Sequence, residues 1–117
     1  MRRNEILESS FSFSVRVDKS SRMLAEHNEY ASSKQILKSG TYIGANIPEA
    51  QQAESTKDFI HKLSIANKEA FETESWIRLL KEVGDITTAQ ADSWIVDCNS
   101  LQKMLISVLR KLNSRRC

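Results

Sequence analysis

Two stretches of the sequence repeat apolar residues at alternating spacings of three and four, and this repeat limits the possible folds more than any other feature. In the C-terminal stretch it runs through Ala91, Trp94, Cys98, Leu101, Leu105, Val108 and Leu112. In the stretch before it, the repeat runs through Phe59, Leu63, Ala66, Ala70, Thr73, Ile77 and Leu80. Residues three and four apart lie on one face of an α-helix, so each stretch predicts an amphipathic helix whose apolar face needs a partner.

Short motifs predict where these two helices begin and end. A T-x-x-Q capping box begins at Thr87, and an S-x-x-D variant of it begins at Ser55. In such a box, side chains satisfy backbone N–H groups that the first helical turn leaves without partners. Gly84 follows the earlier apolar repeat, where a glycine commonly closes a helix in the left-handed conformation. We therefore expect helices over residues 56–83 and 88–113.

A thinner apolar stripe predicts another helix, over residues 30–53. Its members are small or β-branched residues at helical spacing: Ser33, Ile36, Gly40, Ile43, Ile47 and Ala50. We interpret Gly40 and Gly44 as packing glycines, which let a neighbouring backbone approach closely, and not as a phosphate-binding loop. Pro48 cannot donate to the carbonyl group of Gly44, so we expect a kink near Pro48, with a break at Ile47 as the alternative.

The first segment carries apolar side chains on two opposite sides. From Phe11 to Val17 the residues alternate between apolar and polar, as in a half-buried strand, but a lone strand among helices has no partner. We therefore expect a helix over residues 8–27 in which Phe13 and Val17 share one face. Phe11 and Val15 then point to the opposite side, and we expect them to contact another subunit. The alternative is that Phe11 lies in a frayed N-terminal turn and folds back locally.

The composition agrees with an all-α chain. The 117 residues include only three Gly and one Pro, too few for the tight turns of a sandwich or barrel. Short connections make successive helices antiparallel neighbours, so we predict an up-down-up-down antiparallel four-helix bundle, with residues 1–117 forming one domain. The sequence shows no secretory signal, no apolar stretch long enough to span a membrane and no CxxC pair. These features favour a cytoplasmic protein.

No motif that carries catalytic chemistry occurs in the sequence, so we expect a protein that is not an enzyme and holds no cofactor or metal. The candidate metal ligands are His61, Glu69, Glu72 and Glu74. Di-iron bundles use an E-x-x-H element on each of two helices, and neither histidine follows a glutamate at that spacing. We interpret the three carboxylates as solvated or interface groups, and Asn46 as a buried amide that fixes the register of the bundle.

Basic residues gather near both ends of the chain, although the formal net charge is only +2. From Lys103 to Cys117 there are five basic residues and no acidic one. In an up-down-up-down bundle both termini lie at the same end, so we expect one basic patch per subunit, which an oligomer multiplies. The candidate nucleic-acid-binding residues are Arg2, Arg3, Arg110, Lys111, Arg115 and Arg116. The alternative is that cations complement the macrodipole at a helix C-terminus and are otherwise solvated.

Two ordered motifs resemble a bacterial family of four-helix bundles encoded in intervening sequences of 23S rRNA genes. SKQILKSGTYIGANI at residues 33–47, followed by EAQ at 49–51, is similar to the family signature SKQLLRSGTSIGANI with its own EAQ. The stretch from Ser55 to Lys81 resembles the second signature, and the likeness spans about residues 8 to 112. It implies a non-enzymatic bundle that assembles as a ring-like homopentamer. A relative of similar fold, the accessory variability protein of diversity-generating retroelements, is a basic pentamer that binds RNA and a reverse transcriptase.

The sequence thus predicts a non-enzymatic oligomeric scaffold, with the pentamer implied by the resemblance, that binds RNA or DNA weakly through its basic end. The alternative is a protein-binding accessory module whose partner docks on the assembled ring. The two hypotheses differ in their ligand: the first predicts an affinity for nucleic acid that depends on salt, and the second predicts a specific protein partner without nucleic-acid binding.

Overall fold

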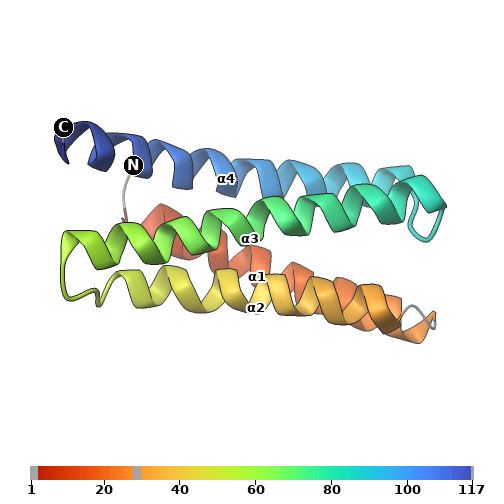
Figure 1. Ribbon diagram of the computed structural model, residues 1–117. Coiled ribbons are helices and arrows are strands. Elements are labelled where there is room, and N and C mark those ends of the chain that lie inside the picture. Colours follow the sequence, from red (N-terminus) through yellow and green to blue (C-terminus); the bar gives the residue numbers. More distant parts are fainter. Residues whose placement is uncertain (1–2, 28–29, 117) are drawn as a thin grey trace.

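The computed structural model describes the backbone of residues 3–27 and 30–116 and the side chains of residues 5–27 and 31–113. Four helices make up most of these residues: α1 (Arg3–Glu26), α2 (Tyr30–Ala50), α3 (Thr56–Val83) and α4 (Thr88–Arg116). Successive helices run antiparallel along a body of 46 × 21 × 21 Å (Figure 1). The described residues contain no strand. The prediction of an all-α, up-down-up-down four-helix bundle is confirmed.

The helices surround one apolar core in the order α1, α2, α3, α4. Within the described residues, the backbone of α1 approaches the backbones of α2 and α4 but not that of α3, so α1 and α3 occupy diagonally opposite corners. The most deeply buried apolar side chains come from all four helices: Leu24, Ile36, Ile43, Ile47, Leu63, Leu80, Leu101 and Leu105. Trp94 is buried, as expected of a residue in the apolar repeat, and Trp76 is half-buried against this core.

The predicted capping motifs are confirmed at the starts of α3 and α4. Ser55 Oγ accepts a hydrogen bond from the backbone N–H of Asp58 at 3.1 Å. Thr87 and Gln90 form the complete box, in which Thr87 Oγ1 accepts from Gln90 N at 3.0 Å and Gln90 Oε1 accepts from Thr87 N at 2.9 Å. Gly84 closes α3 with a left-handed φ of 83°, and its N–H reaches the last carbonyls of that helix. These motifs place the start and end of α3 at the predicted residues.

The other helices differ from their predicted bounds. The segment from 8 to 27 forms a helix and not a strand, but α1 begins at Arg3, where an extra turn brings Ile6 into the core. Helix α4 continues to Arg116, beyond the predicted end at 113. The apolar repeat of α4 stops at Leu112 and does not mark where the helix ends, and the start of α1 depends on Ile6, which precedes the residues that predicted this helix.

Helix α2 passes through Pro48 and ends soon after it. The break at Ile47 does not occur, since α2 continues to Ala50, yet it stops before the predicted end at 53. The carbonyl groups of Pro48 and Glu49 accept from the N–H groups three residues later, at 3.1 and 3.0 Å, which tightens the chain into a turn. Pro48 has no N–H group to donate to the Gly44 carbonyl, so α2 lacks that hydrogen bond, and the helix ends two residues later. The kink near Pro48 stays a prediction.

Helices α1 and α2 approach each other closely at the two glycines of α2. A Cβ atom built on Gly40 would lie 2.5 Å from Val17 Cγ1, and one on Gly44 would lie 2.8 Å from Ser14 Oγ. The interpretation of both as packing glycines is confirmed. A hydrogen bond also joins these two helices: the buried hydroxyl of Ser33 donates to the Ser21 carbonyl at 2.8 Å.

Asn46 does not fix the register of the bundle, contrary to our interpretation. Its side chain is half-buried and donates to the Tyr42 carbonyl at 2.8 Å, one turn back in the same helix. Glu69 was expected to be a solvated or an interface carboxylate, and it is not solvated, because it is buried. Burial and the neighbouring negative charge of Glu72 raise the pKa of Glu69, and the positive charges of Lys68 and Lys38 oppose that rise.

A small polar network lies inside the bundle between α3 and α4. Cys98 Sγ donates to the Ala70 carbonyl at 3.1 Å, and Gln102 Nε2 donates to the same carbonyl at 3.3 Å and to Glu74 Oε1 at 2.9 Å. Burial works to raise the pKa of Glu74, but hydrogen bonds from Gln102 and Arg78 and the charge of Arg78 outweigh it and hold the pKa below its ordinary value. The carboxylate is therefore stabilised in its charged form.

The thiol of Cys98 is expected to react with disulfide reagents only when the protein unfolds. Burial, reinforced by the negative charge of Glu74, raises the pKa of Cys98 to about 12, so almost no thiolate forms in the folded chain. In a Cys117→Ser variant, native protein at about pH 8 should react at least about a hundredfold more slowly than protein in urea. Absorbance of the released thiolate measures both rates, and equal rates would contradict the buried position.

Candidate interaction surfaces

Two apolar side chains stand on the outer face of α1. Phe11 is 72% exposed and Val15 is 39% exposed, whereas Phe13 and Val17 on the other side of the helix are buried. Phe11 lies eight residues after the start of α1, more than two turns inside the helix. The alternative, in which Phe11 lies in a frayed N-terminal turn and folds back locally, is therefore wrong. The stripe is available for contact with another molecule, as expected of an interface.

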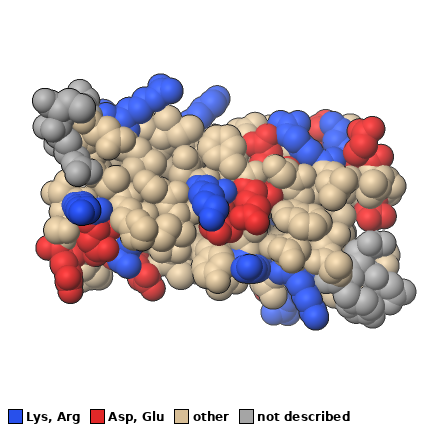
Figure 2. Space-filling model, in the orientation of Figure 1, with Lys and Arg blue, Asp and Glu red and all other residues tan. Residues whose placement is uncertain are grey.

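The basic residues of α4 line a shallow hollow on its outer surface. Lys103, Arg110 and Lys111 surround Ile106 and Ser107, and the hollow has a volume of about 520 Å³. All three cations are exposed, and among the described side chains none of them pairs with a carboxylate. Figure 2 shows Lys and Arg side chains projecting from the edge of the molecule over the C-terminal half of α4, with no acidic side chain beside them.

The structure places part of the predicted basic patch. Arg110 and Lys111 lie in this hollow, and Lys103, which the site prediction left out, joins them from two turns earlier on the same face. The spacing of 103, 107, 110 and 111 along one helix is the signal that points to it. Arg2 lies outside the described residues, as do the side chains of Arg3, Arg115 and Arg116. Helix α1 starts, and helix α4 ends, at one end of the bundle (Figure 1).

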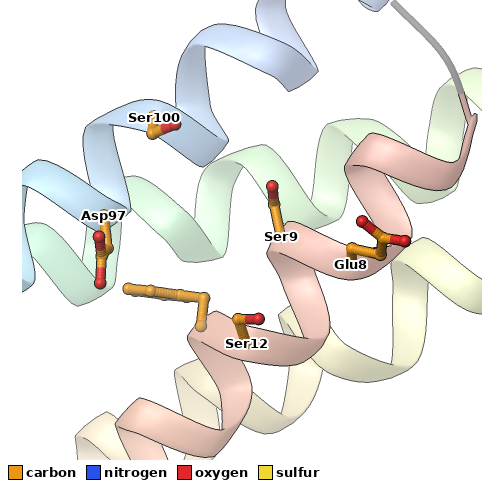
Figure 3. Close-up of a pocket in the computed structure, with 6 residues that line it drawn as sticks. Glu8, Ser9, Ser12, Asp97 and Ser100 are labelled. Carbon is orange, nitrogen blue, oxygen red and sulfur yellow. The ribbon is translucent and has the colours of Figure 1, made fainter.

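A polar hollow of about 330 Å³ lies in the seam between α1 and α4, where the two helices pack least closely. Figure 3 shows the side chains that line it: Glu8, Ser9, Ser12, Phe13, Asp97 and Ser100. The Asp97 carboxylate pairs with the guanidinium group of Arg16, which also donates to Ser93 Oγ. The sequence prediction missed this site, because its residues come from helices far apart in the chain.

No arrangement typical of a metal centre appears in the part of the chain that the structure describes. His61 is exposed on α3, Glu72 is exposed and Glu74 is engaged by Gln102 and Arg78. Within that part there is no group of three or more histidine, cysteine, aspartate or glutamate side chains that could hold an ion. The surfaces that the described residues present are suited to binding by charge and by apolar contact.

A protein-family model described as 23S rRNA-intervening sequence protein matches residues 2–107. The chain belongs to this family. One solved structure resembles the chain closely: a protein of unknown function from the S23 ribosomal protein family of Bacteroides thetaiotaomicron, with 47% sequence identity and a TM-score of 0.91. The similarity covers 94% of this chain and 99% of that one. No curated protein matches the chain.

The family resemblance read from the two sequence motifs is therefore confirmed over nearly the whole chain. In this member of the 23S rRNA-intervening sequence family, the first motif supplies the close contact between α1 and α2 through Gly40 and Gly44. Among the described residues, none of the helices is long and apolar enough to cross a membrane.

Proposed function

We propose that the protein is a non-enzymatic homo-oligomeric scaffold, a pentamer by its family resemblance, that binds RNA weakly through the basic hollow of α4. The observation that carries the proposal is the convergence of Lys103, Arg110 and Lys111 around one hollow without a carboxylate partner among the described side chains. Three unpaired cations on one surface suit a chain of phosphate groups. Ile106 between them offers an apolar surface for a base.

The weak affinity follows from the charges. Neutralising three phosphates of a single strand corresponds to a salt slope of about −2 per subunit, since each phosphate contributes about −0.7. The negative end of the α4 macrodipole works against an anion near Arg110 and Lys111, so one subunit alone binds poorly. Repetition of the hollow around an oligomer raises the effective concentration of cations and gives the assembled protein its affinity.

Reversing the charges at Arg110 and Lys111 should weaken RNA binding. We expect Arg110→Glu with Lys111→Glu to weaken the binding of a single-stranded RNA, measured by fluorescence anisotropy, by about tenfold or more per assembled ring, and to flatten the salt dependence. The matched control is Lys34→Glu with Lys57→Glu, which changes the net charge equally at exposed positions of α2 and α3. Equal losses in both variants, or an affinity that salt does not change, would contradict the proposed site.

The second candidate function is a protein-binding accessory module. It is favoured by the polar hollow between α1 and α4, where Ser9, Ser12 and Ser100 offer hydroxyl groups beside Glu8 and Asp97. Such a hollow suits a polar or basic segment of a partner protein. This function predicts that the charge-reversed variant keeps its protein partner, and that the wild-type protein does not bind RNA. A monomeric mass by light scattering at micromolar concentration would contradict the oligomeric scaffold in both forms.

A further inference from the structure

A second apolar stripe lies on the outer face of α3. Phe71 is 46% exposed and Leu79 is 50% exposed, and Val83 at 60% continues the stripe toward the end of the helix. The three residues lie on the same side of α3, and an apolar patch on one face of a protein marks an interaction site. Nothing in the binding of RNA by the basic hollow uses them. Apolar side chains are also exposed on α2 (Leu37 and Tyr42) and on α4 (Val96), but α1 and α3 each carry more than one of them at helical spacing along one side of the helix.

The two stripes lie on different sides of the bundle. Helices α1 and α3 occupy diagonally opposite corners and run in the same direction (Figure 1). A single subunit cannot bring its own stripes together, but a second copy can offer its α3 stripe to the α1 stripe of the first. Contacts between two different surfaces of identical subunits build rings or filaments, in which every copy uses both surfaces.

The charges that flank the stripes are complementary. On α1, Glu8 precedes the stripe and Arg22 follows it, whereas on α3 Lys68 precedes Phe71 and Glu82 follows Leu79. Each pair is 14 residues apart, about 21 Å along a helix, and in each case phenylalanine follows the first charge by three residues. All four side chains are exposed. When the two helices run parallel, Glu8 faces Lys68 while Arg22 faces Glu82.

We infer that the α1 stripe of one subunit binds the α3 stripe of the next in a parallel, head-to-tail contact that builds the oligomer. The inference rests on the proposed assembly and adds the surfaces that make it. In this register Val15 falls between Phe71 and Leu79 of the neighbour, and Phe11 lies beside Phe71. Arg22 is held by Asp18 at 3.0 Å and keeps further N–H groups for Glu82 of the neighbour.

A two-fold contact between two α1 stripes covers less of the exposed apolar surface. An antiparallel pair centred on Val15 would also bring Glu8 near Arg22. It would leave the α3 stripe exposed in the dimer. The head-to-tail contact covers both stripes on every copy once the ring is closed.

Paired cysteines test the contact directly. Val15→Cys and Ser75→Cys are introduced into a Cys117→Ser protein, in which the remaining thiol, Cys98, is buried. After oxidation, we expect the doubly substituted protein to form a ladder of covalent multimers on a denaturing gel, up to the size of the native oligomer. Each single substitution alone should stay monomeric on the gel, and an equal mixture of the two should give covalent dimers and nothing larger.

Other modes of subunit contact give different covalent products on the gel. Covalent dimers from Val15→Cys alone would establish the two-fold α1 contact and overturn the inference. Absence of any ladder from a protein that light scattering shows to be oligomeric would also overturn it, while leaving the proposed assembly intact. A monomeric wild-type protein would remove the proposed assembly and this contact together.

A charge swap provides a second measurement. Glu8→Lys with Arg22→Glu should weaken self-association by about tenfold or more, measured by sedimentation, because like charges then face each other at both ends of the stripe. Adding Lys68→Glu and Glu82→Lys to the same chain should restore it. If the variant with all four substitutions does not reassemble, although its circular dichroism spectrum shows that it is still helical, the proposed register is contradicted.

Discussion

Substituting Gly40 with alanine is expected to lower the free energy of unfolding by about 2 kcal/mol, although alanine is the better helix former by about 1 kcal/mol. The new Cβ would lie 2.5 Å from Val17 Cγ1 and 3.0 Å from Val17 Cβ. Valine is restricted at χ1 and is attached to the facing backbone, so it cannot move aside without separating α1 from α2. Urea unfolding followed by circular dichroism measures the change.

Two companion variants make the cause of this loss testable. Val17→Ala removes the methyl groups that clash, so the double variant should lose less stability than the sum of the two single variants, by about 1 kcal/mol or more. Gly44→Ala is the matched control. Its Cβ would approach the hydroxyl of Ser14 at 2.8 Å, and a serine hydroxyl can rotate away, so a smaller change is expected. A Gly40→Ala protein more stable than wild type would contradict the close approach.

Most of the fold could be predicted from the sequence because its signals are local. The capping boxes at Ser55 and Thr87 and the closing glycine at 84 depend on residues within one turn of each other. The start of α1 at Arg3 and the end of α2 at Ala50 were predicted at other residues for the opposite reason. They depend on whether a terminal turn finds a place in the core, or on how a proline is accommodated, and neither is visible in a periodic pattern.

The surfaces were harder to predict, because they depend on which faces the neighbouring helices leave uncovered. The exposure of Phe11 could be predicted, since Phe13 already occupied the core side of the same helix. The sequence shows Lys103 as one of several basic residues near the C-terminus. That it lines the same hollow as Arg110 is visible only when the outer face of α4 is known. Asn46 was misplaced since a family motif does not show which of its residues face inward.

The polar network between α3 and α4 gives the second large effect. Gln102→Leu is expected to lower the free energy of unfolding by about 2 kcal/mol at neutral pH, because it removes the 2.9 Å hydrogen bond to a mostly buried carboxylate and the 3.3 Å bond to the Ala70 carbonyl. Leucine has a similar volume, so the loss reflects the missing hydrogen bonds and not a cavity. Chemical unfolding at several pH values measures it.

The pH dependence separates this loss from a packing defect. In the wild type the pKa of Glu74 is lower in the folded than in the unfolded chain, so its carboxylate stabilises the fold above its unfolded pKa and loses that contribution as the pH falls through the folded value. Removal of Gln102 raises the folded pKa, and the difference between variant and wild type should therefore shrink as the pH falls below about 4. Glu74→Gln is the matched control, because its neutral amide oxygen can still accept from Gln102. A deficit that stays constant from neutral to acidic pH would show that the hydrogen bond to the carboxylate is not its cause.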